Sequence, residues 1–178
     1  MIILLACFFR LFGYICKNIT PRNMNDNGYS QPTLKILLVE DDDDDRLFFT
    51  EAVREISTSH ELFFAKDCLE LFSMLDEADT FDLIFLDINL PVMNGRECLQ
   101  QIKSSDKYKN VPVIIFTGSH AQSDVDFVYE HGAHYHVVKP YAHINYLASL
   151  KMVLEVNWKE KQAIPSREDF VVNLAFSN

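Results

Sequence analysis

The chain has 178 residues, 48% of them hydrophobic, and a net charge of −10. That length and composition predict one globular domain with extensions. The acidic balance, with no basic stripe in the sequence, argues against direct binding of DNA or RNA. The four cysteines have neither metal-ligand spacing nor the density of a disulfide scaffold, so a reducing cytoplasm is the expected location.

Residues 1–33 are expected to lie outside the domain. The first 16 residues are apolar, but a membrane-spanning helix needs about 20 such residues. They also lack the basic start of a signal peptide. Met24 opens a stretch typical of a protein start, so we predict that it is the true start and that residues 1–23 are disordered and dispensable. A weak membrane anchor is the alternative, and no stable membrane association is expected.

Five short apolar runs then alternate with five segments of helical periodicity. The predicted strands are residues 35–39, 61–65, 83–86, 113–116 and 135–138. The predicted helices follow caps at Asp44 or Asp45 and at Asp67, and then cover 95–103, 123–130 and 145–159. This alternation predicts parallel strands joined by right-handed crossovers, which make a three-layer α/β sandwich. Residues 162–178 are expected to form a tail that packs on the domain, at the sheet edge or on the last helix.

Polar side chains follow four of the five predicted strands. Glu40 and Asp41 follow the first, Asp87 the third, Thr117 the fourth and Lys139 the fifth. The carboxyl ends of parallel strands share one edge of a sheet, so these groups are expected to converge there. Three carboxylates without a cation would repel one another, and Mg²⁺ prefers oxygen ligands. A carboxylate can also attack a phosphoryl group, whose charge a metal ion, a lysine and a hydroxyl group would stabilise.

Three other site types are disfavoured by the same residues. An aspartyl-phosphate phosphatase would have a second aspartate where Asn89 stands. A dinucleotide-binding domain would show a glycine-rich turn after the first strand, and this chain has an acidic run there. A calcium loop in the run 41–45 would require a glycine at its sixth position, which is absent. Asp87 taken alone could also be a polar residue that caps the following turn.

Four motifs in this order resemble a response-regulator receiver domain, and the resemblance covers about residues 34–160. They are Val39–Asp42, Phe85–Gly95, Phe116–Ser119 and Val137–Pro140. Other stretches further resemble stand-alone bacterial receivers without a DNA-binding domain, namely 40–46, 132–135 and 170–172. The resemblance implies a flavodoxin-like, doubly wound (βα)5 domain over residues 34–161, with strand order 2-1-3-4-5.

The same resemblance implies a role for each matching residue. Asp87 would be the phosphoacceptor, and Mg²⁺ would be held by Glu40, Asp41, Asp87 and the main-chain carbonyl of Asn89. The hydroxyl of Thr117 would move to the phosphoryl group. Lys139 would pair with the phosphoryl group through its positive charge. Pro140 would follow Lys139 through a cis bond, as is usual in the family. At the switch position, where the family has an aromatic ring, this chain has His136, with Tyr135 expected to face the other way.

The resemblance therefore implies a single-domain response regulator. It would take a phosphoryl group from a sensor histidine kinase or a histidine phosphotransfer protein, and it would catalyse only its own phosphorylation and dephosphorylation. Output would pass to a downstream protein target, and a homodimer would form through the face made by the fourth helix, the fifth strand and the fifth helix. The alternative is a degenerate receiver that binds proteins without phosphorylation. The imidazole of His136 also suggests a pH-dependent switch, against the alternative of a packing substitution.

Overall fold

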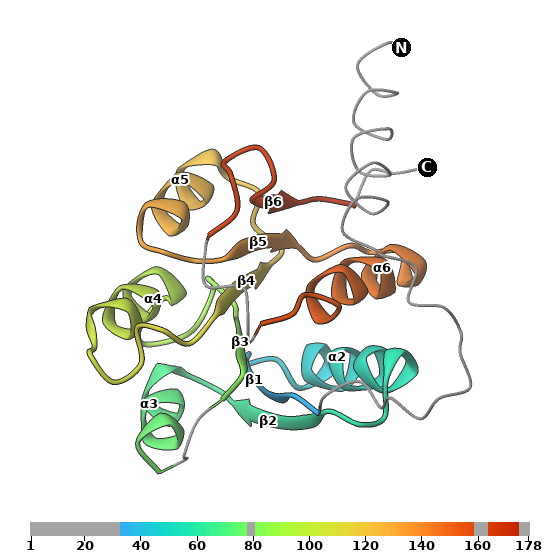
Figure 1. Cartoon of the computed structure of the whole chain (residues 1–178), viewed down its shortest axis with the longest axis horizontal. Coiled ribbons are helices and arrows are strands. Elements are labelled where there is room, and N and C mark those ends of the chain that lie inside the picture. The colour runs from blue at the N-terminus through green and yellow to red at the C-terminus, as the bar shows by residue number, and fades with distance from the viewer. Residues whose placement is uncertain (1–32, 78–80, 159–163, 175–178) are drawn as a thin grey trace. The chain divides into compact units, whose positions relative to one another are not determined.

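The computed structural model describes residues 33–77, 81–158 and 164–174, and its strands form one parallel sheet (Figure 1). The sheet order is β2-β1-β3-β4-β5-β6. The strands are β1 Lys35–Val39, β2 Glu61–Ala65, β3 Leu83–Leu86, β4 Val113–Thr117, β5 Tyr135–Val138 and β6 Val171–Val172. The predicted order 2-1-3-4-5 is confirmed, and β6 extends the sheet beyond β5.

Helices cover both faces of this sheet, as the three-layer prediction requires. Their bounds are α2 Asp43–Ile56, α3 Cys68–Glu77, α4 Gly95–Ser104, α5 Gln122–Glu130 and α6 His143–Leu154. Figure 1 shows α2 and α6 on one side of the sheet and α3, α4 and α5 on the other. The buried side chains divide in the same way, into one cluster with α2 and α6 and a second with α3, α4 and α5.

The centre of the sheet is apolar on both faces. All four residues of β3 are buried, and they alternate between the two clusters of the core. On the α2 side, Phe49, Phe85 and Phe116 meet edge to face, with ring centroids 5.0 to 5.8 Å apart. Such aromatic pairs contribute about 0.5–1.5 kcal/mol each beyond the burial of their surface. This packing fixes β3 against β4, so the residues that follow the two strands emerge side by side.

Two predicted helix ends are wrong. The cap of α2 is Asp42 rather than Asp44 or Asp45, because its carboxylate accepts the main-chain N–H groups of both, each at 2.9 Å. In a run of aspartates any member can serve as a cap, and the others then lie in the first turn, where negative charge is favourable. The last helix ends at Leu154 rather than at residue 159. Its end is closed by Trp158, whose indole N–H donates to the carbonyl of Val153.

The tail contributes the strand that the sequence did not predict. The two residues of β6 pair in parallel with β5, Val171 opposite His136 and Val172 opposite Val137. Phe170 is fully buried and meets the ring of Tyr129 edge to face. A strand of two residues is too short to show alternation, so sequence periodicity could not reveal it.

The remaining expectations concern the ends of the chain and one peptide bond. Met24 and the rest of residues 1–32 lie outside the described residues. None of the helices in the described part of the chain is long and apolar enough to cross a membrane. The Lys139–Pro140 bond is trans, so the expected cis bond is wrong here. The trans isomer is the ordinary choice at X–Pro bonds, by about 0.5–1 kcal/mol.

Candidate functional site

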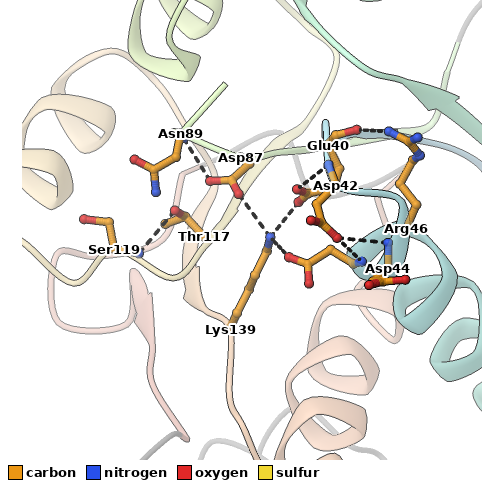
Figure 2. Close-up of polar contacts among 10 residues, drawn as sticks. Glu40, Asp42, Asp44, Arg46, Asp87, Asn89, Thr117, Ser119 and Lys139 are labelled. Atoms are coloured by element: carbon orange, nitrogen blue, oxygen red, sulfur yellow. Dashed lines mark hydrogen bonds and ion pairs between the residues drawn. The ribbon is translucent and has the colours of Figure 1, made fainter. Parts of the chain in front are cut away.

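One lysine and three carboxylates meet at the carboxyl edge of the sheet (Figure 2). The ammonium Nζ of Lys139 lies 2.6 Å from Glu40 Oε2, 2.7 Å from Asp45 Oδ2 and 3.0 Å from Asp87 Oδ2. Lys139 follows β5, Glu40 follows β1 and Asp87 follows β3. Asp45 lies in the first turn of α2. The structure thus brings Glu40, Asp87 and Lys139 together, and it adds Asp45, which the sequence indicated only as a helix cap.

The charges in this cluster do not balance. Burial raises the pKa of Glu40, Lys139 lowers it in part, and the charge of Asp87 raises it further. Burial alone would lower the pKa of Lys139, but the carboxylates of Asp87, Asp45 and Glu40 raise it well above its ordinary value. Lys139 is therefore held as an ammonium ion, and one positive charge faces up to three negative ones.

Asp87 is fixed by its own loop. Its side chain is buried, Oδ1 accepts the main-chain N–H of Asn89 at 3.0 Å, and Oδ2 faces Lys139. Gly95, the first residue of α4, packs directly on the main chain after β3. A β-carbon on Gly95 would overlap the main-chain oxygen of Asp87 and lie 2.8 Å from the Cα of Ile88. A larger residue at position 95 would therefore displace the peptide of Asp87, which explains the glycine at this position.

The loop between Asp87 and α4 contains an unusual backbone conformation. Val92 has φ 67°, and its side chain is 91% exposed. A β-branched residue is rarely found in this left-handed region. A left-handed backbone conformation costs about 1–2 kcal/mol of free energy relative to the right-handed one. No pattern in the sequence predicted it, because valine is usually a residue of strands.

A second group of polar contacts lies beyond β4 and β5. Thr117 is fully buried, and its Oγ1 accepts the N–H of Ser119 at 3.2 Å. The Nε2 of His136 lies 3.0 Å from the carbonyl oxygen of Ser119. Tyr135 belongs to the core cluster with α2 and α6, while His136 reaches the segment that leads into α5. The expectation that these two neighbours face opposite sides of the sheet is confirmed.

The residues proposed to hold a metal ion are partly assembled. Glu40 and Asp87 are buried at the site, while Asp41 and Asn89 are exposed. Within residues 33–77, 81–158 and 164–174, no three His, Cys, Asp or Glu side chains are grouped so that they could hold a metal ion. The donor set nevertheless consists of oxygen atoms with excess negative charge, which fits the preference of Mg²⁺. Burial is the main cause of the raised pKa of Glu40, and the neighbouring charge of Asp87 adds to it.

Exposed apolar side chains occur on α2, on α6 and in the segment that follows Lys139. Leu47 on α2 is 58% exposed, Tyr141 after β5 is fully exposed, and Ile144 on α6 is 72% exposed. Phe48 joins the two helices, because its ring meets that of His143 at 5.6 Å and that of Tyr146 at 4.6 Å. Contiguous exposed apolar surface is typical of contact sites for other proteins, and these side chains are candidates for such a contact.

Known proteins resemble this chain in sequence and in fold. Residues 36–151 match the family model of the response regulator receiver domain. The response regulator Rcp1 of Synechocystis sp. is 32% identical over 143 residues, which are 77% of this chain and 97% of that protein. The crystal structure of the phosphorylated cyanobacterial phytochrome response regulator RcpA is similar with a TM-score of 0.66, at 30% identity, over 76% of this chain and all of RcpA. The Mn²⁺-bound form of Rcp1 gives a TM-score of 0.64, at 30% identity, over 75% of this chain and 99% of that one.

Proposed function

The chain belongs to the response regulator receiver domain family, and on that premise we propose that it accepts a phosphoryl group on Asp87 and signals through contacts with other proteins. The observation that carries the proposal is the position of this carboxylate. It is buried at the end of β3, with one oxygen held by a main-chain N–H and the other facing the ammonium group of Lys139.

The proposed reaction is a transfer between a phosphohistidine and this carboxylate. An oxygen of Asp87 attacks the phosphorus atom, the phosphorus–nitrogen bond of the donor breaks, and an acyl phosphate forms while the donor histidine leaves. Lys139 faces the phosphoryl oxygens as a fixed positive charge, and the hydroxyl of Thr117 becomes a hydrogen-bond donor to them. Water then attacks the phosphorus atom, the bond to the Asp87 oxygen breaks, and inorganic phosphate leaves while Asp87 returns to the carboxylate.

We propose Mg²⁺ as the cofactor, held by Glu40, Asp41, Asp87 and the main-chain carbonyl of Asn89. The ion would supply the positive charge that phosphoryl transfer needs beyond Lys139. Two observations support it. Glu40 and Asp87 present buried oxygen atoms with uncompensated charge, and the related Rcp1 has been crystallised in a Mn²⁺-bound form.

The proposed partners are proteins. A sensor histidine kinase or a histidine phosphotransfer protein would donate the phosphoryl group, and the exposed Leu47, Tyr141 and Ile144 would meet it. A downstream protein target would receive the signal in the cytoplasm. A homodimer would form through the face made by α5, β5 and α6. No contact with nucleic acid is proposed, because the chain is strongly acidic.

The test is phosphorylation of the purified protein by a small acyl phosphate donor with Mg²⁺, followed by intact mass measurement. The wild type should gain the mass of one phosphoryl group, and Asp87→Ala should gain none. Asp106→Ala, which removes an exposed carboxylate on the surface, is the matched control and should behave like the wild type. Removal of divalent ions with a chelator should abolish the gain.

Two outcomes would contradict the assignment. A mass gain that survives Asp87→Ala would place the phosphoryl group elsewhere. No gain in the wild type, with either the small donor or a range of kinases, would favour the alternative that the domain binds its partners without phosphorylation.

A further inference from the structure

The buried ring of His136 has one satisfied nitrogen and one unsatisfied nitrogen. A carbonyl oxygen can only accept, so the contact of Nε2 with Ser119 places the proton on Nε2. The other nitrogen, Nδ1, then carries a lone pair. It is buried and has no hydrogen-bond partner among the described residues. The neutral ring thus fits its site, whereas a protonated ring would bury a second N–H and a charge without an acceptor.

The charged groups around the ring do not offer that acceptor. On α5, the carboxylate of Asp124 lies near enough to favour the charged ring. It is already bonded to the hydroxyl of Ser119 at 2.6 Å and to the guanidinium of Arg96, from α4, at 3.2 Å. On the other side of β5, the paired residue of β6 is the apolar Val171. Burial lowers the pKa of His136, and the Ser119 carbonyl and Asp124 offset this only in part.

We propose that His136 is a proton-sensitive latch on the segment Thr117–Ser119, which follows β4. The neutral ring holds the segment through the carbonyl of Ser119. A protonated ring leaves its buried position and releases the segment. Mild acidification therefore shifts the population from the latched to the released arrangement.

The latch would matter for signalling because of what the segment contains. The N–H of Ser119 donates to Oγ1 of Thr117, so release of Ser119 changes the surroundings of the hydroxyl assigned to the phosphoryl group. This consequence rests on the proposed function, whereas the latch itself does not. The phosphorylation of Asp87 is therefore measured separately, at pH 7.5, where the neutral form of the ring predominates in both states.

Nuclear magnetic resonance from pH 7.5 to 5.5 tests the latch. The His136 ring should titrate below the ordinary midpoint of about 6.5. If only the released state takes up the proton, the opening equilibrium grows by a factor of 1 + 10^(6.5 − pH), which is about tenfold between these two pH values. The exchange of the Ser119 amide, corrected for its intrinsic pH dependence, should accelerate by that factor.

Two variants separate the latch from a general effect of acid. His136→Phe keeps a planar ring without a proton site, so the acceleration should disappear. His120→Gln removes an exposed histidine of the same loop and should leave it unchanged. If His136→Phe does not fold, His136→Gln replaces it: its amide N–H can donate to the Ser119 carbonyl but takes up no proton in this range, so the acceleration should again disappear.

A His136 midpoint at or above 6.5 would overturn the latch, and so would equal acceleration in the wild type and in His136→Phe. A normal latch without any phosphorylation of Asp87 would instead contradict the proposed function alone. A phosphorylated protein whose Ser119 exchange does not depend on pH would contradict the latch alone.

Discussion

The carboxyl edge of the sheet has a charged half and an uncharged half, built on neighbouring strands in different ways. The charged half consists of Glu40, Asp45, Asp87 and Lys139, and it depends on one ammonium group among three carboxylates. The uncharged half consists of Thr117, Ser119 and His136, joined by hydrogen bonds between neutral groups. The first half has an excess of negative charge, whereas in the second half burial disfavours a charge on the ring of His136. The two halves should therefore respond to mutation and to pH in opposite ways.

Removal of Lys139 should give the largest effect on stability. Lys139→Met leaves buried carboxylates without their cation, and such a broken buried pair costs about 3 kcal/mol of unfolding free energy at pH 8. Urea unfolding measures it. Lys151→Met is the matched control, since its pair with Glu155 is exposed and such pairs contribute about 0.5 kcal/mol or less. Equal losses in the two variants would show that the charged half contributes no more than an ordinary surface pair.

The pH dependence of stability should have opposite signs in the two halves. The pKa of His136 is lowered in the folded protein, so the unfolded chain takes up the proton first, and stability falls as pH drops below about 6.5. The pKa of Glu40 is raised from 4.5, so the folded protein holds that proton longer, and stability falls as pH rises from 4.5 to the folded value. Each group contributes a slope of at most about 1.4 kcal/mol per pH unit.

Single variants should separate these two slopes, which partly cancel in the wild type. Urea unfolding from pH 4.5 to 7.5 should show His136→Phe losing less stability in acid than the wild type. Glu40→Gln should show the reverse change, a steeper loss in acid. Parallel curves for all three proteins would mean that neither side chain differs in proton affinity between the folded and unfolded states.

The smallest expected effect is a gain in stability. Asp87→Asn removes the negative charge that raises the pKa of Glu40, yet its side-chain oxygen can still accept the N–H of Asn89. We expect stabilisation of about 1 kcal/mol, or about 3 °C in Tm for a domain of this size. Asp106→Asn, on the exposed surface, should leave Tm unchanged. A lower Tm for Asp87→Asn would show that attraction to Lys139 outweighs repulsion between the carboxylates.

The sequence predicted most of the sheet because its strands are short apolar runs, and β1, β3, β4 and β5 are buried almost throughout. The bounds of β1, β2, β3 and β5 coincide with the predicted ranges, and the parallel order follows from the alternation with helices. The convergence of Glu40, Asp87 and Lys139 was predictable for the same reason, since parallel strands end at one edge.

What the sequence missed depends on contacts between distant residues. Asp45 pairs with a lysine 94 positions away, and nothing local distinguishes it from the neighbouring aspartates. The contact of Asp124 with Arg96 joins two helices whose relative position is set by the sheet. The left-handed conformation of Val92 is imposed by the loop around it, against the preference of the residue itself.

The short β6 strand has a practical consequence for anyone who shortens this protein. A fragment cut to the family match at residue 151 would lose Phe170, and with it the carbonyl that accepts the main-chain N–H of His136 at 3.0 Å. The outer side of β5 would become an open sheet edge with the apolar Val137 in it. Open edges recruit strands from other molecules, and the same cut would remove Val153, Leu154 and Trp158 from the core, so aggregation during expression would be expected of the fragment.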